Sequence, residues 1–421
     1  MKRKRYVVVG VGGRGTGMFV RPLAKRFPMT AELAAVCDSN AVRLAYCNAT
    51  LPRPVPAYTD FDRMLHEVKP DAVVVATRDC THEPFVLAGL AAGKRVYSEK
   101  PLCTTVAQCR AILAAAKRSR GECFVTHNLR YLPAMGRIRD IIRAGTLGRV
   151  SHMRFDETLD RGHGADYFRR WHRQIDNSGG LLIHKASHHF DILNWWADAK
   201  PATVQARGRL AFYGRNGGFR GKRCLGCAHA RECSFHIDFF KRKEYRKMYQ
   251  EAECEDGYLR DGCVFDRNID ICDQMDVLVQ YQNDIQVSYT LNAFSPYESM
   301  RCVIEGTGGR LEYEWTFPAR LSGVEWMPQL AEQTTETLRL YAAGMPVKQV
   351  KLPRQKGAHG GADELLGAEF FGDWSKKPSD RMATLDAAAQ AVLIGAAANR
   401  SIATGRSVDV QELLHDKEET P

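Results

Sequence analysis

The stretch RYVVVGVGGRGTG, residues 5–17, joins an apolar run to a glycine-rich turn. The run predicts a buried β-strand, and Gly10, Gly12 and Gly15 follow it in the spacing G-x-G-x-x-G. Glycines at these positions allow a tight turn and a close approach of the backbone. The helix that we expect from about residue 18 to 26 would offer free N–H groups to a pyrophosphate. Because glycine-rich turns are common, the assignment depends on the segments that follow.

The next strand, ELAAVCD, ends in Asp38. An acidic side chain at this distance from the glycines accepts hydrogen bonds from ribose hydroxyls, which favours NAD over NADP. The alternative reading is that Asp38 only caps a loop.

Strands and helices alternate from there to residue 128. DAVVVAT (71–77), RVYSEKPL (95–102) and CFVTHN (123–128) read as buried strands, with helices at about 83–92 and 105–118 between them. This pattern predicts a doubly wound parallel sheet, whose ligands bind at the carboxyl ends of the strands. The residues expected to bind the cofactor are Gly10, Gly12, Gly13, Arg14, Gly15, Asp38, Thr77, His82, Glu99, Lys100 and Asn128.

Composition limits the classes of protein. The 421 residues suffice for two or three domains, and 44% hydrophobic content supports a core. The sequence contains no apolar run long enough to span a membrane, and the glycines and Arg14 interrupt what could resemble a signal peptide, so we expect a cytoplasmic protein. The net charge of +11 is scattered along the chain, which argues against nucleic acid as a partner.

A second stretch, SGGLLIHKASHHFDILNWW (178–196), places ionisable residues in an apolar run that reads as one helix ending near Asp198. On a helical period Leu181, His184, His188 and Asp191 share one stripe. HKASH has the histidine spacing of a zinc protease, but the lysine in the position of the catalytic glutamate would repel the metal. His189, Trp195 and Trp196 read as core.

GVGGRG, ATRDCTH, GKRVYSEKPL, THNLRY and the histidine stretch together resemble the Gfo/Idh/MocA oxidoreductases, from residue 6 to about 410. The resemblance implies a Rossmann domain (1–127) and an α/β domain with an open, mostly antiparallel sheet (128–410), and a dimer or tetramer. It implies that Lys100 and His188 flank the transferred hydride, with a cis peptide bond before Pro101. A neutral imidazole suits removal of a hydroxyl proton, and an ammonium stabilises the developing alkoxide.

The sequence departs from the family pattern in the histidine helix, where His184 stands at the usual aspartate and Ala186 at the usual glycine. A histidine there supplies no permanent negative charge, so the substrate or the chemistry differs. The polar, aromatic loop upstream offers groups suited to sugar hydroxyls. The residues expected at the substrate are Lys100, His163, Trp171, His172, His184, Lys185 and His188.

RCLGCAHARECSFH begins a cysteine-rich insertion at about 214–262. Cys224, Cys227 and Cys233 form a compact thiol group suited to a structural zinc, with Cys263, Cys254, His229 or His236 as the fourth ligand. An Fe–S cluster, a disulfide or free thiols are the alternatives. In each case we expect the insertion to support a loop on the substrate side. The six cysteines before residue 130 read as reduced core residues.

After the insertion, period-two alternation predicts antiparallel strands turning at Asn283-Asp284 and Gly308-Gly309, then a long helix ending at Gly405 and a polar tail (411–421). The sequence thus predicts a hydride transfer from a secondary hydroxyl of a sugar, inositol or related polyol to NAD. One alternative is a redox-neutral glycoside hydrolase that oxidises its substrate transiently. A second is a non-catalytic NAD-binding sensor.

Overall fold

The computed structural model describes residues 3–317, 334–353 and 361–415, and the chain divides into two compact units. The first unit comprises residues 1–132, 239–260 and 356–392, and the second comprises 133–238, 261–355 and 393–421. The units therefore do not follow chain order, in contrast to the expected boundary after residue 127. Two later segments of the chain belong to the unit that the N-terminal residues begin.

The first unit is built on a seven-stranded sheet in the order β15-β6-β5-β4-β1-β2-β3. The strands β1 to β6 are parallel and β15 is antiparallel, which confirms the doubly wound sheet. The strands are β1 (Lys4–Val9), β2 (Ala31–Cys37), β3 (Ala57–Tyr58), β4 (Ala72–Val75), β5 (Arg95–Ser98), β6 (Cys123–Val125) and β15 (Ala383–Thr384).

Helices connect these strands as the alternation predicts. A π-helical turn, Gly15–Val20, leads into α1 (Arg21–Lys25) in place of one regular helix. The other connecting helices are α2 (Ala41–Ala49), α3 (Phe61–Val68), α4 (His82–Ala91) and α5 (Val106–Arg118). The later segments add α11 (Lys243–Tyr245), α12 (Glu253–Asp256) and α14 (Ala362–Phe370) to this unit.

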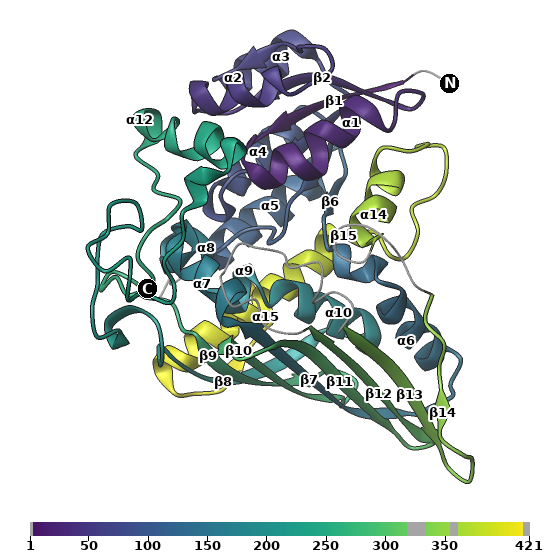
Figure 1. Ribbon diagram of the computed structural model, residues 1–421. Helices are drawn as coiled ribbons and strands as arrows, with labels where there is room; N and C mark the ends of the chain where they lie inside the picture. Colours follow the sequence, from purple (N-terminus) through teal and green to yellow (C-terminus); the bar gives the residue numbers. More distant parts are fainter. Residues whose placement is uncertain (1–2, 318–333, 354–360, 416–421) are drawn as a thin grey trace. The chain divides into compact units, whose positions relative to one another are not determined.

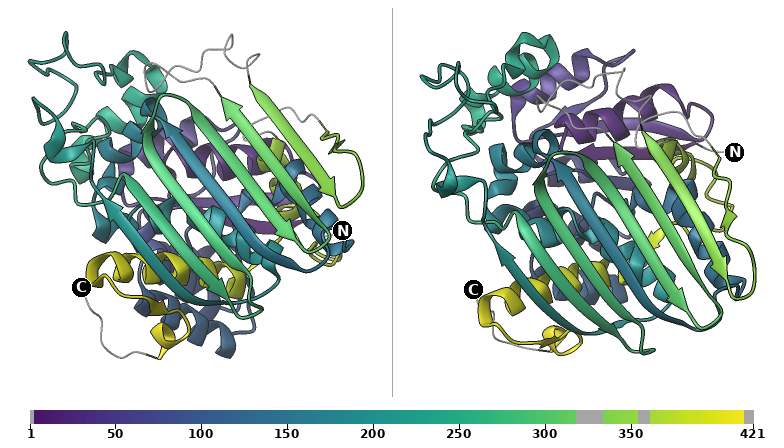
Figure 2. Two further views of the ribbon diagram at one scale, coloured as in Figure 1. Left: turned by 90° about the horizontal axis from the view of Figure 1, so that it is seen from below. Right: turned by 60° about the horizontal axis from the view of Figure 1, so that its bottom comes forward.

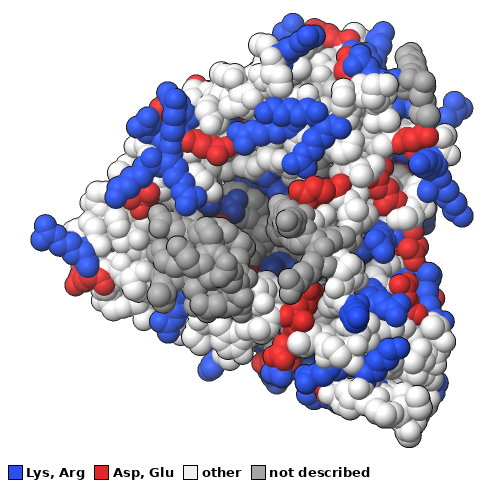
Figure 3. Space-filling view, turned by 45° about the vertical axis from the view of Figure 1, so that its right-hand side comes forward, with Lys and Arg blue, Asp and Glu red and all other residues white. Residues whose placement is uncertain are grey.

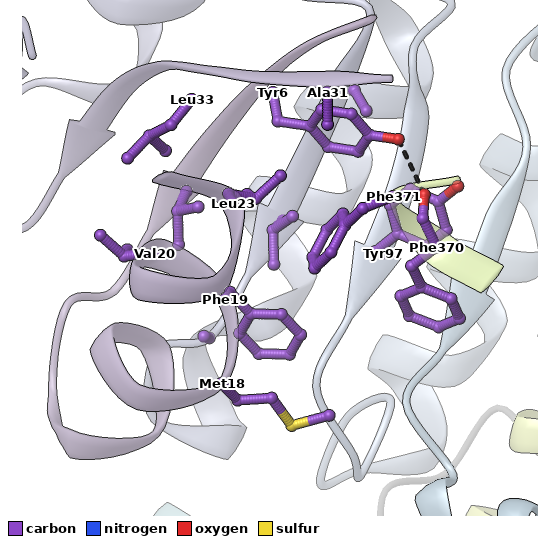
Figure 4. Packing of buried hydrophobic residues seen from close by; sticks show 14 of the residues in the cluster. Tyr6, Met18, Phe19, Val20, Leu23, Ala31, Leu33, Tyr97, Phe370 and Phe371 are labelled. Atoms are coloured by element: carbon purple, nitrogen blue, oxygen red, sulfur yellow. Dashed lines mark hydrogen bonds between the residues drawn. The ribbon is translucent and has the colours of Figure 1, made fainter. Parts of the chain in front are cut away.

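Aromatic packing explains why α14 joins the N-terminal unit. The Tyr6 hydroxyl, from the first strand, donates a hydrogen bond of 2.7 Å to the carbonyl oxygen of Phe370, and the ring of Phe371 packs edge-on against Tyr6 (Figure 4). All three side chains are fully buried. The apolar area that they remove from water fixes a segment far away in sequence onto the first strand.

The second unit holds a nine-stranded sheet in the order β14-β13-β12-β11-β7-β10-β9-β8-β16. Every neighbouring pair is antiparallel except β7 and β10, which confirms the open, mostly antiparallel sheet. The strands are β7 (Val150–Asp160), β8 (Pro201–Arg209), β9 (Gln274–Tyr281), β10 (Gln286–Ser295), β11 (Glu298–Gly306), β12 (Gly309–Phe317), β13 (Thr335–Ala342), β14 (Lys348–Gln349) and β16 (Val408–Asp409). The two predicted hairpin turns are present.

Helices lie on one face of this sheet, and the other face carries none in the views of its outer side (Figure 2). They are α6 (Pro133–Arg143), α7 (Arg161–Arg169), α8 (Ile175–Ser178), α9 (Leu181–His184), α10 (Ser187–Ala197) and most of α15 (Leu385–Thr404) (Figure 1). The last of these is the predicted long helix before Gly405. A side chain at Gly395 of α15 would lie 2.6 Å from the Leu182 carbonyl, so this glycine lets α15 approach α9 closely.

None of the helices in the described ranges is long and apolar enough to cross a membrane. Residues 416–421 of the predicted polar tail lie outside the described residues. On the face drawn in Figure 3, Lys and Arg side chains stand among Asp and Glu side chains and form no single basic field there.

Candidate functional site

The glycine turn after β1 has the shape that a pyrophosphate requires. Gly10 has a φ of +89°, and a side chain there would lie 2.5 Å from the carbonyl carbon of Ala76. A side chain on Gly15 would lie 1.9 Å from the Gly10 carbonyl oxygen, whereas one on Gly12 meets no atom within 4 Å. The first and third glycines therefore close the turn, and the second leaves open space for a ligand to approach the backbone. The residues present fit a dinucleotide.

Asp38, at the end of β2, is 8% exposed and holds this turn. Its carboxylate accepts hydrogen bonds from the backbone N–H groups of Val11 and Asn40, each at 2.9 Å, and lies 3.3 Å from the Arg43 guanidinium. Arg43 also pairs with Asp256 at 2.9 Å. Two carboxylates thus surround one guanidinium, and the group carries a net negative charge. The capping alternative and the proposed ribose contact are compatible, because a carboxylate accepts more hydrogen bonds than these.

Asp256 belongs to residues 239–260, which we name the strap. The Tyr249 hydroxyl accepts a hydrogen bond of 3.0 Å from the Gly13 N–H, and Asn40 donates one of 2.8 Å to the Ala252 carbonyl. Arg21 pairs with Glu244 at 2.8 Å. The strap therefore packs on the glycine turn and α2. For this half of the insertion the printed contacts are with the glycine turn, Asn40 and Arg43 of the first unit.

The carboxyl ends of β5 and β6 carry a polar network. The Arg14 guanidinium lies 2.6 Å from Glu99 and 3.3 Å from Asp363, and Asn128 donates a hydrogen bond of 2.7 Å to Asp363. The backbone N–H of Lys100 donates to Glu99 at 3.0 Å. Two residues predicted to bind the cofactor, Arg14 and Asn128, thus meet at Asp363, a carboxylate that sequence reasoning missed. The expected cis peptide bond joins Lys100 to Pro101.

His82 lies fully buried at the start of α4. Its Nδ1 is 2.8 Å from the Pro101 carbonyl oxygen, and its Nε2 is 3.3 Å from that of Thr77. Burial lowers the pKa of His82, so the ring is neutral. His82 thus joins the backbone after β4 to the backbone of Pro101 after β5. The contact of His82 with the cofactor stays a prediction.

The histidine stretch of the second unit forms two helices, α9 and α10, with a break at Lys185 and Ala186. The N–H of Ala186 donates to the carbonyl of Leu181, five residues earlier, at 2.8 Å. This wide turn shifts the following residues, so the predicted single stripe through His184 and His188 does not exist as one continuous helix face. Both histidines are nevertheless buried, at 8% and 9% exposure.

The break turns Lys185 toward a buried carboxylate on β7. Lys185 Nζ lies 3.0 Å from Glu157, with side-chain exposures of 15% and 4%. Burial lowers the pKa of Lys185, but the opposing charges, chiefly Glu157, leave that pKa above its usual value and the ammonium charged. His189 Nδ1 is 2.9 Å from the Tyr289 hydroxyl, as expected of a core histidine.

The predicted substrate residues of the second unit gather beside this ion pair. His163 Nδ1 lies 3.0 Å from Glu298, and its Nε2 lies 3.1 Å from the Tyr167 hydroxyl. The rings of His172 and His184 meet with centroids 4.1 Å apart, and Trp171 stacks on His172. We name the set the polar cluster: Glu157, His163, Tyr167, Trp171, His172, His184, Lys185 and Glu298.

Sequence reasoning left Glu157 and Glu298 out of this cluster. The signal for Glu157 was present, because period-two alternation puts it on the same face of β7 as the buried Met153 and Phe155. A carboxylate on the apolar face of a strand needs a buried partner. Trp195 and Trp196 are buried core residues, as predicted.

The thiols of Cys224, Cys227, Cys233 and Cys263 line one cavity of about 20 Å³ in the second unit. Of the other ligands considered, His236 lines it too, whereas Cys254 is exposed on the strap. All thirteen cysteines lie within the described ranges and form no disulfide there, and those before residue 130 are buried or half-buried. Within the described part of the chain, no group of three or more His, Cys, Asp or Glu side chains stands at metal-binding geometry.

Two family models match the chain. The description "Oxidoreductase family, NAD-binding Rossmann fold" covers residues 4–127, and "Oxidoreductase family, C-terminal alpha/beta domain" covers residues 139–410. YteT of Bacillus subtilis (strain 168), named as an oxidoreductase, is 33% identical over 98% of this chain and 99% of its own length. An inositol 2-dehydrogenase of Acidothermus cellulolyticus is 31% identical over 47% of this chain and 56% of its own length.

Solved structures share the fold. Levoglucosan dehydrogenase in complex with NADH and L-sorbose has a TM-score of 0.69 at 17% identity, covering 97% of this chain and 99% of that one. The aldose-aldose oxidoreductase from Caulobacter crescentus, in complex with glycerol, has a TM-score of 0.65 at 17% identity, covering 97% of this chain and 100% of that one.

Proposed function

We propose that this chain, which belongs to the Gfo/Idh/MocA family of oxidoreductases, transfers hydride from a secondary hydroxyl of a sugar, inositol or related polyol to NAD. The observation that carries the proposal is the edge formed by the carboxyl ends of β1, β4 and β5. The open glycine turn, Thr77 and Lys100 follow these three strands, which pair in parallel in the order β1, β4, β5. A dinucleotide bound at this edge has Lys100 beside it.

The glycine turn and Asp38 would hold the pyrophosphate and ribose. We infer NAD as the cofactor because the Arg43 guanidinium, which pairs with Asp38, is already neutralised by Asp38 and Asp256. A guanidinium in this region accommodates the 2′-phosphate of NADP, and here the surplus carboxylate would repel it. When bound, NAD accepts the hydride.

While NAD accepts the hydride, side chains of the protein must remove the proton of the substrate hydroxyl. We propose that His188 removes the proton of the substrate hydroxyl and that Lys100 stabilises the negative charge that develops on the oxygen.

We propose that the polar cluster binds the hydroxyls of the substrate. It combines a charged ammonium, two carboxylates and three imidazoles, which together donate and accept hydrogen bonds in several directions. The names of an inositol dehydrogenase and a levoglucosan dehydrogenase among the similar proteins agree with a polyol substrate. The three neighbouring histidines His163, His172 and His184 also favour a second candidate, the redox-neutral glycoside hydrolase, which must move additional protons.

The proposal includes three properties of the molecule as a whole. The helix-free face of the nine-stranded sheet supports a homo-oligomer, dimer or tetramer, that forms on this face. The free thiols favour a reducing, cytoplasmic compartment. The thiols that line one cavity support a structural zinc that takes no part in hydride transfer.

The test is absorbance of NADH with purified protein, NAD, and a panel of sugars, sugar acids, inositols and their aryl glycosides. We expect NADH with one polyol, and His188→Ala should abolish its formation while NAD still binds. Two matched controls, the exposed His66→Ala and Lys117→Met, should retain activity, whereas Lys100→Met should lose it. Aglycone release without NADH would establish the hydrolase. Normal activity in His188→Ala would remove it as the base, and bound NAD with no turnover on the panel would favour the sensor.

A further inference from the structure

The chain brings four cysteine thiols from three segments to one small cavity. Cys224 and Cys227 flank a tight turn in which Gly226 has a φ of +71° and the Cys227 N–H donates to the Cys224 carbonyl at 3.1 Å. The turn is therefore fixed by its own backbone. Cys233 follows six residues later, and Cys263 comes from the far side of the strap.

Backbone pairing holds Cys263 beside this turn. The Cys224 N–H donates to the Asp261 carbonyl at 2.9 Å, and the Cys263 N–H donates to the Lys222 carbonyl at 3.2 Å. Arg223 and Gly262 form an antiparallel bridge between the same two segments. The convergence of Cys224, Cys227 and Cys263 thus follows from main-chain hydrogen bonds rather than from flexible side chains.

A buried positive charge faces the thiols. Arg169, at the end of α7, is 2% exposed, and its guanidinium lies 3.2 Å from Cys224 Sγ and donates to the Phe235 carbonyl. In the described part of the chain Arg169 forms no ion pair with a carboxylate. A buried guanidinium at this position would offset the negative charge of a metal–thiolate centre. The N–H groups of Gly221 and Phe265 also point at Cys263 Sγ, at 3.5 and 3.4 Å, as donors do around thiolate ligands.

We propose that Cys224, Cys227, Cys233 and Cys263 bind one Zn²⁺ in a closed tetrahedral site. Binding replaces the four thiol protons, which leave as H⁺, with four Zn–S bonds, so the centre carries two negative charges and Arg169 balances one of them. The cavity of about 20 Å³ has room for a single ion. Coordination would bring the four thiolates to the ion, because metal binding and local folding are coupled.

The position of the zinc centre in the chain indicates a structural role for it. The strap leaves the second unit directly after the segment of Cys233 and returns directly before Cys263. One ion bound to both cysteines would close residues 234–262 into a loop and restrict both ends of the strap. The zinc would therefore act as a staple for the segment that contacts the glycine turn, outside the chemistry of hydride transfer.

The test is the metal content of purified full-length protein, measured by inductively coupled plasma mass spectrometry. We expect one zinc per chain in the wild type and in Cys254→Ser, a control cysteine on the strap that does not line the cavity. Cys227→Ser and Cys263→Ser should lose zinc. Because such variants can misfold, the wild type is also stripped with a chelator and titrated with Co²⁺, which should give the visible absorption of a tetrahedral thiolate complex at one equivalent.

Each other result overturns the proposal. Wild-type protein that carries no zinc and gives no thiolate absorption with Co²⁺ has no such site. Stoichiometric iron and sulfide would establish a cluster instead. Loss of zinc in Cys254→Ser, or its retention in both Cys227→Ser and Cys263→Ser, would show that the ligand set is wrong. None of these readouts depends on the oxidoreductase activity, so their failure is separate from failure of the proposed function.

Discussion

The ion pair between Lys185 and Glu157 allows the polar cluster to be tested by stability alone. Glu157→Leu removes the carboxylate and leaves an ammonium that is 15% exposed without its partner. Breaking a buried pair in this way costs about 3–5 kcal/mol, which corresponds to a fall in Tm of about 6–20 °C for a unit of about 200 residues. Lys185→Met should cost less, because Glu157 can take up a proton and become neutral.

This difference has a defined pH dependence. Burial already raises the pKa of Glu157 against the opposing effect of Lys185, so removing Lys185 raises that pKa further. A carboxyl whose pKa is higher in the folded state stabilises the protein at low pH, and this contribution disappears as the pH rises through the folded pKa. The loss of stability in Lys185→Met should therefore shrink as the pH falls toward about 4.3, the ordinary pKa of glutamate.

The assay is chemical unfolding of the wild type, both single variants and Glu157→Leu/Lys185→Met, followed by a signal from the second unit. The double variant should recover most of the loss, because replacing both members of a buried ion pair with apolar groups is often neutral or stabilising. Its KM for the polyol should nevertheless remain raised, since Lys185 is proposed to bind substrate. Additive losses, or a cost below about 1 kcal/mol for Glu157→Leu, would show that the pair is solvated and the reasoning wrong.

Three further perturbations test the first unit. Gly12→Ala should leave Tm unchanged and weaken NAD binding, because a side chain there enters the open space expected to hold the ligand. Gly15→Ala should instead lower Tm, because its side chain would lie 1.9 Å from a carbonyl oxygen. Equal effects of the two variants in calorimetry and in NAD titration would contradict this assignment. Asp256→Asn should raise the affinity for NADP relative to NAD by about two- to fivefold, because it removes one partly exposed negative charge. Glu244→Gln, also on the strap, is the control and should leave this ratio unchanged. An unchanged ratio in Asp256→Asn would refute the charge argument. Burial lowers the pKa of His82, so the folded state binds a proton there less tightly than the unfolded chain does. The contribution of His82 to the free energy of unfolding should therefore be full above about pH 6.5 and decrease below it. Urea unfolding at several pH values should show a smaller decrease in His82→Asn than in the wild type.

The sequence predicted the parts of the fold that depend on local pattern. The glycine turn, the alternation that builds the parallel sheet and the hairpins of the open sheet all follow from residue periodicity and turn chemistry. The gathering of His163, His172, His184 and Lys185 was also predicted, although the helix break that arranges them was not. At the break Lys185 pairs with Glu157 on another element, a contact that the helical pattern does not contain.

Long-range contacts account for what the sequence did not show. Arg43 and Asp256 are 213 positions apart, and Tyr6 and Phe370 are 364 positions apart. The local sequence pattern of the strap and of α14 does not indicate which residues they contact. Both segments were therefore interpreted as parts of the second domain. The available signals were indirect: a run of charged and aromatic residues that no period explains, and the apolar pair Phe370-Phe371.

The strap links the proposed zinc site to the proposed NAD site, so thermodynamic linkage relates the affinities for the two ligands. If zinc restricts the ends of the strap, and the strap supplies Tyr249 and Asp256 beside the glycine turn, then zinc changes the affinity for NAD through the chain between Cys233 and Cys263. Linkage requires that NAD change the affinity for zinc by the same factor. Cofactor titrations of zinc-loaded and stripped protein, paired with zinc titrations with and without NAD, must give equal ratios. A strap whose position is fixed by its own contacts with α2 gives a ratio of one in both, and the zinc then stabilises only the second unit.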